Sequence, residues 1–138
     1  MIQDGFNLRW AFTTFYYGNW SPLTWLYHMF DYKLFGPDPF GHHLSSFVLH
    51  ILNSLLFYFL LNKLFRNKKI SFIAAAIFAL HPVHVEAFVW VSSHKDVLSG
   101  FFWFLSLIFY LRYLETRKLR EYLFLLIVFV CGLMSKSV

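Results

Sequence analysis

Four long apolar runs dominate the pattern of hydrophobic and polar positions along the chain. They lie at about 42–65, 70–93, 97–114 and 122–138, and each is typical of a helix. The first covers about 24 residues, or roughly 36 Å at about 1.5 Å per residue, which is enough to cross a hydrocarbon core of roughly 30 Å. The pattern predicts an all-α fold, a polytopic bundle of transmembrane helices.

The second apolar run is interrupted by Pro82. A proline inside a helix removes one backbone hydrogen bond and clashes with the preceding turn, whereas it is well tolerated at the first helical position. We therefore expect a helix over 70–80, a break at His81, and a short extension over 82–93 on the outer side of the membrane.

Residues 1–41 precede the first long run and resemble a segment at the membrane surface. Ser21-Pro22 offers a helix start and Gly36 a stop, and several aromatic rings of the kind that sit among lipid headgroups lie between them. We predict an outer loop over 1–41 that contains an interfacial helix at about 22–35.

Composition excludes an ordinary soluble domain. Hydrophobic residues make up 59% of the chain, aromatic residues 23% and charged residues 14%, whereas soluble domains carry roughly 25% charged residues. The chain has one cysteine, Cys131, so an intramolecular disulfide is excluded. The natural partner for so much apolar surface is the lipid bilayer.

Basic residues cluster in the two connections that follow the first and third apolar runs. By the positive-inside rule these loops are cytoplasmic, so residues 1–41 and 81–96 are expected on the extracytoplasmic side. Because these cations flank apolar spans and do not share one soluble face, nucleic acid is excluded as a partner. The clustered cations are Lys63, Arg66, Lys68, Lys69, Arg112, Arg117, Lys118 and Arg120.

The outer connection HPVHVEAFVWVSSHKD, residues 81–96, holds the candidate chemistry. Charged groups are costly at membrane depth, so those that persist usually face a cavity or a partner. A carboxylate of Glu86 or Asp96 could act as a general base, and Lys95 or Lys136 could neutralise a phosphate.

Simpler interpretations stay open for the same residues. Ser93 and Asp96 fit a helix capping box, and a lysine at this depth can extend its ammonium to the water without binding anything. His81 and His84 are spaced as two metal ligands could be, but zinc requires three or four, so we expect no metal site and no cofactor.

The order of four motifs resembles that of GT-C membrane glycosyltransferases. The motifs are NWSPLTWLYHMFDYKLFG, GHHLSSFVLHILNSLLFYFLL, the stretch from AAAIFALHPVHVE to SSHKDVLSG, and GLMSK. The resemblance is closest to the transmembrane and tetratricopeptide-repeat O-mannosyltransferase-like proteins and their bacterial relatives. It implies transfer of a sugar from a polyprenyl-phosphate carrier to a hydroxyl group of an acceptor protein or glycan, in the bacterial inner membrane or the endoplasmic reticulum membrane.

The resemblance assigns catalytic roles to Asp96 and Glu86, and substrate-binding roles to His81, His84 and Lys95. It also implies a first helix and an acidic motif upstream, and a repeat domain downstream. We therefore expect the chain to be a piece of a larger enzyme and to be inactive alone. Two positions depart from the family pattern, where arginine is usual in place of His94 and proline in place of Ser137.

Two other functions remain open at this stage. One is a membrane subunit or assembly module without catalytic activity, in which the same polar residues only cap and pack helices. The other is a transporter fragment that uses His84 and Glu86 in a proton relay, although such relays need ionisable groups near the middle of the bilayer and these lie toward one surface.

Overall fold

The computed structural model describes residues 21–82 and 94–136, and their regular structure is helical throughout. The prediction of an all-α fold is confirmed. The helices, in chain order, are α2 (Pro22–Phe35), α3 (Pro39–Phe65), α4 (Lys68–Leu80), α6 (His94–Thr116) and α7 (Leu119–Ser135).

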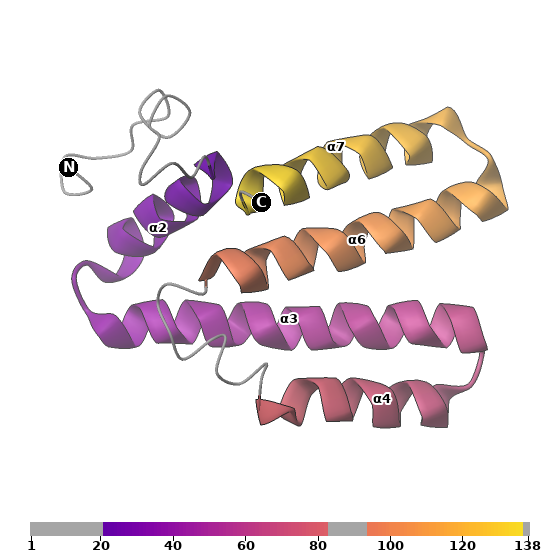
Figure 1. The fold of residues 1–138 in the computed structure, drawn as a ribbon, viewed down its shortest axis with the longest axis horizontal. Coiled ribbons are helices and arrows are strands. Elements are labelled where there is room, and N and C mark those ends of the chain that lie inside the picture. Colours follow the sequence, from indigo (N-terminus) through magenta and orange to yellow (C-terminus); the bar gives the residue numbers. More distant parts are fainter. Residues whose placement is uncertain (1–20, 83–93, 137–138) are drawn as a thin grey trace.

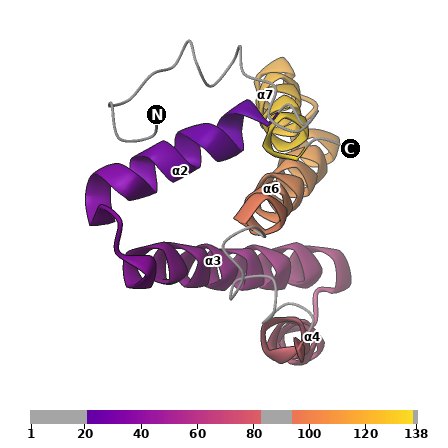
Figure 2. The ribbon, with the colours of Figure 1, turned by 60° about the vertical axis from the view of Figure 1, so that its left-hand side comes forward.

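Four helices lie roughly side by side in the order α4, α3, α6, α7 (Figure 1). Helix α2 runs across one end of this row, from the start of α3 to the end of α7, and packs against α3, α6 and α7 (Figure 2). We call this end the α2 end. The opposite end, which carries the connections at 66–67 and 117–118, is the loop end.

Two helices are long and apolar enough to cross a membrane, Phe40–Phe65 and Lys95–Thr116 within the described residues. Burial is inverted relative to a soluble protein, since large hydrophobic side chains such as Phe72 and Leu80 are exposed while polar ones are buried. An apolar exterior is stable in lipid and not in water. The buried polar residues include Thr24, Asp31, Ser46, His50, Asn53 and Ser71.

Helix ends depart from the predicted spans by a few residues. The structure starts α3 at 39 where the apolar pattern predicted 42, because Asp38 accepts a hydrogen bond from the Phe40 amide at 3.0 Å and a proline occupies the first turn. α6 and α7 also start earlier, at 94 and 119, because an apolar run does not reveal the polar first turn of its helix.

The expected break before Pro82 is present. α4 ends at Leu80, and His81 has an extended backbone with φ −65° and ψ 129°. Pro82 disfavours the helical conformation in the residue before it, which explains the stop. The predicted extension over 82–93 falls almost entirely outside the described residues.

Two glycines shape the turn between α2 and α3. Gly36 has a φ of 63°, a conformation that side chains rarely adopt, and its amide donates to the Tyr32 carbonyl at 2.8 Å to close α2. Gly41 lies against the Phe35 ring, where any larger side chain would collide. The turn therefore fixes α2 against the first turns of α3.

Candidate functional site

Two polar side chains of α2 are buried in the structure, while two of its apolar side chains are exposed. Thr24 and Asp31 are buried, with 7% and 1% of their surface exposed, whereas Phe30 and Leu34 are more than half exposed. Thr24, His28 and Asp31 are spaced by four and three residues, so they share one face of the helix. This arrangement gathers hydrogen-bonding groups at the α2 end.

An ion pair joins the start of α6 to the residue that follows α7. Lys136 Nζ lies 2.8 Å from Asp96 Oδ1, and the two side chains are 49% and 41% exposed. Exposed pairs of this kind contribute only about 0.2–1 kcal/mol to stability. A carboxylate and an ammonium that remain half exposed can be reached by a ligand.

Thr24 connects α2 to the end of α7 close to this pair. Its hydroxyl donates to the Ser135 carbonyl oxygen at 2.5 Å, across 111 residues of sequence. Ser135 is fully buried and is the last residue of α7, so its carbonyl has no partner within the helix. The hydrogen bond therefore satisfies a terminal carbonyl that the protein interior would otherwise leave unpaired.

A second polar cluster, formed by Asp31, Ser45 and His42, joins α2 to the first turns of α3. Ser45 Oγ donates to Asp31 Oδ2 at 2.6 Å, and His42 Nδ1 lies 3.6 Å from the same oxygen. Because Asp31 is almost fully buried, these contacts must compensate for the removal of its charge from water. The cluster fixes the far half of α2 to α3.

Two more titratable groups of α2 respond to this buried carboxylate. Burial lowers the pKa of His28 from its ordinary value of 6.5; the Asp31 charge acts in the opposite direction, and His42 reinforces the lowering. Burial also raises the pKa of Tyr27, against the effect of its hydrogen bond with Ser45. Neutral imidazole and neutral phenol are thus the favoured forms beside Asp31.

A groove of about 320 Å³ lies between α2 and α3. Its walls are apolar and include Phe30, Leu34, Val48 and Leu52. Such a groove suits a hydrocarbon chain better than a sugar, because it offers few polar groups to replace the water around hydroxyls.

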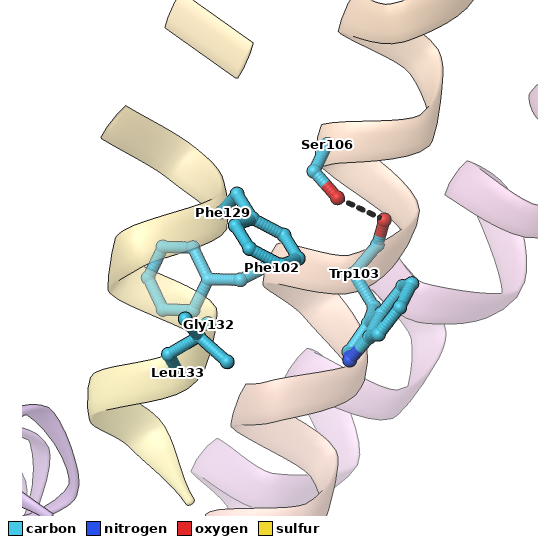
Figure 3. Close-up of a pocket in the computed structure, with 6 residues that line it drawn as sticks. All are labelled: Phe102, Trp103, Ser106, Phe129, Gly132 and Leu133. Carbon is cyan, nitrogen blue, oxygen red and sulfur yellow. Dashed lines mark hydrogen bonds between the residues drawn. The ribbon is translucent and has the colours of Figure 1, made fainter. Parts of the chain in front are cut away.

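A smaller cavity between α6 and α7 is not a binding site. Figure 3 shows the rings of Phe102 and Phe129 beside Gly132, with the Ser106 hydroxyl turned back to the Trp103 carbonyl at 2.8 Å. The cavity measures about 10 Å³, close to the lower limit for one water molecule. It is a packing gap in the helix interface.

Asn53 ties α3 to α6 just below the Asp96 turn. Its side-chain amide donates to the Val97 carbonyl at 2.8 Å, and the small Gly100 lies beside it. A buried amide bonded across two helices holds their relative rotation. The start of α6, and with it Asp96, is therefore anchored to α3.

The predicted site residues fall in different places. Asp96 and Lys95 lie in the first turn of α6, and Asp96 has a cation as its partner. His81 is exposed at the end of α4, and α3 lies between that helix and α6 (Figure 1). Glu86 and His84 lie outside the described residues, as does Ser93 of the expected capping box.

Sequence reasoning did not single out Thr24, His28 or Asp31 as site residues. The available signal was their spacing, which places three polar side chains on one face of a helix otherwise rich in apolar residues. For metals, no group of three or more His, Cys, Asp or Glu side chains within 21–82 and 94–136 could hold an ion.

Comparisons with known proteins place this arrangement in a family. Protein O-mannosyl-transferase tmtc2 of Xenopus laevis is 36% identical over 99 residues, which are 72% of this chain and 12% of that protein. Protein O-mannosyl-transferase TMTC1 of Homo sapiens is 30% identical over 126 residues, which are 83% of this chain and 14% of that protein. No solved structure matches.

The matched part is therefore short relative to these proteins, since the chain spans 12% to 14% of their length. The family match itself covers residues 21–138, which include every described helix and the Asp96–Lys136 pair. The chain belongs to the dolichyl-phosphate-mannose-protein mannosyltransferase family.

Proposed function

We propose that this chain forms part of a glycosyltransferase site that moves a mannosyl group from a polyprenyl-phosphate carrier to a hydroxyl group of an acceptor protein. The Asp96–Lys136 pair carries the proposal, because it offers a carboxylate and an ammonium, 2.8 Å apart and half exposed, at the end of two apolar helices. Family membership supports the choice of donor and acceptor, both of which its description names.

The reaction needs both charges. The acceptor oxygen forms a bond to the anomeric carbon of the sugar while the bond from that carbon to the phosphate oxygen breaks. The phosphate leaves with the electron pair, and the hydroxyl proton passes to a base. Lys136 and Lys95 bind the phosphate and balance its charge in the donor and as it leaves, while Asp96 orients Lys136 and presents a carboxylate to the acceptor.

The remaining predicted residues belong to the same proposal. Glu86 supplies a second carboxylate, and His81 and His84 donate hydrogen bonds to the sugar or the phosphate. We also propose that the chain crosses the membrane several times with the α2 end on the extracytoplasmic side, because cations such as Arg66, Lys69 and Arg117 are concentrated at the loop end.

Cysteine labelling in intact membranes tests the orientation. In a Cys131→Ala background, Asp38→Cys should react with a membrane-impermeant thiol reagent added from the extracytoplasmic side, and Asn67→Cys and Thr116→Cys should not. The reverse pattern would place the α2 end on the cytoplasmic side and remove the proposed site from the lipid-linked donor.

Asp96→Asn in the full-length gene product tests the chemistry. The variant keeps the shape of the side chain and removes its charge, so mannosyl transfer should fall on the order of a hundredfold or more. Glu115→Gln is the matched control, because Glu115 pairs with Lys63 at the same 2.8 Å distance at the loop end. A stable Asp96→Asn protein with undiminished transfer would refute the proposal and favour a non-catalytic membrane module.

A further inference from the structure

The position of Lys136 depends on the last turn of α7. Lys136 follows that helix directly, and its backbone is extended, with φ −135° and ψ 118°. A lysine side chain has four rotatable bonds, so its ammonium group can reach a partner in several directions. The fold fixes only the backbone position from which the side chain starts. Whatever fixes the end of α7 therefore fixes the reach of Lys136.

Thr24 is a side chain of another helix that holds the backbone at this end. Its hydroxyl donates to the carbonyl of Ser135, the residue directly before Lys136, and both residues are buried. The Ser135 hydroxyl is itself bonded to the Cys131 carbonyl at 2.8 Å, which stiffens the same turn from within. Helix ends usually fray, so an interhelical bond to the last carbonyl restrains a turn that would otherwise move.

The other half of α2 is anchored independently. Asp31 accepts from Ser45 on α3, and Gly41 lets α3 approach Phe35 closely. α2 thus cannot follow α7 freely, and the Thr24 bond ties the end of α7 to a fixed support. On the other side of the ion pair, Asn53 fixes the start of α6 to α3. Both partners of the Asp96–Lys136 pair are therefore held in place relative to α3, Asp96 through Asn53 and Lys136 through α2.

We propose that Thr24 is a positioning residue, which holds Lys136 where it can bind the phosphate of the lipid-linked donor. The inference rests on the proposed function of Lys136. Thr24 does not act on the reacting atoms, so its loss affects donor binding through the lysine and leaves the chemical step largely intact.

The test uses the full-length gene product in membranes, with lipid-linked mannose as the donor. Thr24→Val is nearly isosteric and removes only the hydroxyl, so the donor KM should rise about five- to tenfold with little change in kcat. Thr24→Ser keeps the hydroxyl and should restore the donor KM to within about twofold of the parent. Thr116→Val is the control, because the Thr116 hydroxyl bonds to Arg112 within one helix at the loop end.

Lys136→Gln separates the inference from the function on which it rests. A raised donor KM for Lys136→Gln together with an unchanged KM for Thr24→Val would overturn the positioning role and leave the proposed function standing. An unchanged donor KM for Lys136→Gln would remove the proposed function itself.

A second measurement does not require turnover. In a Cys131→Ser background, Lys136→Cys should react with a water-soluble thiol reagent at a rate that changes when Thr24 becomes Val and not when it becomes Ser. If Thr24→Val does not accumulate, Thr24→Ala replaces it. Equal reaction rates in all three backgrounds would overturn the inference.

Discussion

The two ends of the helical row carry similar ion pairs in different surroundings. At the loop end, Lys63 and Glu115 join α3 to α6 at 2.8 Å; at the α2 end, Lys136 and Asp96 join α7 to α6 at the same distance. The pairs are alike in length, and both partners of each pair are at least partly exposed. What differs is the packing around each pair. The residues around a pair therefore determine whether that pair can form part of a binding site.

The neighbours at the loop end are local. Glu121 is buried between Arg112 and Arg120 of its own hairpin, at 3.7 and 3.6 Å, and Arg66 and Arg117 close the two turns with φ angles of 52° and 53°. These contacts close the connections between consecutive helices. They hold the hairpins together.

The neighbours at the α2 end are distant in sequence. α2 adds a third wall there, with the Thr24–Ser135 and Asp31–Ser45 hydrogen bonds tying it to α7 and α3. An exposed ion pair beside a helix that other contacts hold in place can receive a ligand in a defined orientation. We therefore place function at the α2 end and structural support at the loop end.

Exchanging the two charges of each pair should produce the largest contrast. The double variant Asp96→Lys with Lys136→Asp keeps an ion pair but puts an anion where we propose that the phosphate binds, so transfer should fall on the order of a hundredfold or more. The matching exchange, Lys63→Glu with Glu115→Lys, should leave transfer within about twofold. Equal losses of transfer activity from both exchanges would show that the two ends do not differ in function.

Removing the buried carboxylate of α2 should have an intermediate effect. Asp31→Ala removes the 2.6 Å acceptor of the Ser45 hydroxyl, which keeps its 3.0 Å bond to the His42 carbonyl, and the loss of a hydrogen bond to a charged group costs about 1.5–3 kcal/mol. Lys63→Gln, which breaks an exposed pair, should cost less than about 1 kcal/mol. Unfolding in mixed detergent measures both, and a smaller cost for Asp31→Ala would show that the cluster does not anchor α2.

Acidification should weaken the α2 end by a smaller amount. Because burial lowers the pKa of His28 below 6.5, the unfolded chain binds more protons than the folded one in this range. The stabilising contribution is therefore complete above about pH 6.5 and is lost as the pH falls through that value toward the lowered pKa. Asp31 and His42 also face this group, and after burial their effects on the His28 pKa act in opposite directions, Asp31 raising it and His42 lowering it.

Thermal unfolding at pH 7.5 and pH 5.5 measures the effect, with His28→Gln as the comparison. The parent should lose more stability on acidification than the variant. The loop end offers no histidine among its described residues, since its charges are lysine, arginine and glutamate. An identical loss of stability on acidification in parent and variant would show that His28 does not contribute to the pH dependence.

The sequence predicts elements better than contacts in this protein. Long apolar runs revealed the helices, and Pro82 revealed the break at His81, because both signals act within a few residues. The face of each helix is harder to predict, since helices that are apolar all round give no period from which to read their rotation. The Thr24–Ser135 bond spans 111 residues, so the sequence around either residue does not indicate its partner.

The candidate site residues were also easier to predict where their signal was local in the sequence. Asp96 stood out because a carboxylate beside an apolar run is unusual. Lys136 stood out because it is a cation at the end of an apolar run. Asp31 did not, because an acid on a surface helix is ordinary until its burial is known. Its role depends on Ser45 and His42 across a turn, and thus on the packing of α2 against α3.

Binding of a polyprenyl phosphate to the full-length protein in nanodiscs tests the central claim most directly. Lys136→Gln at the α2 end should weaken binding about tenfold or more, because it removes the cation that pairs with the phosphate. Lys63→Gln, which removes the matching cation at the loop end, should leave the affinity unchanged. Equal affinities for the two variants would contradict the assignment of the lipid-phosphate site to the α2 end.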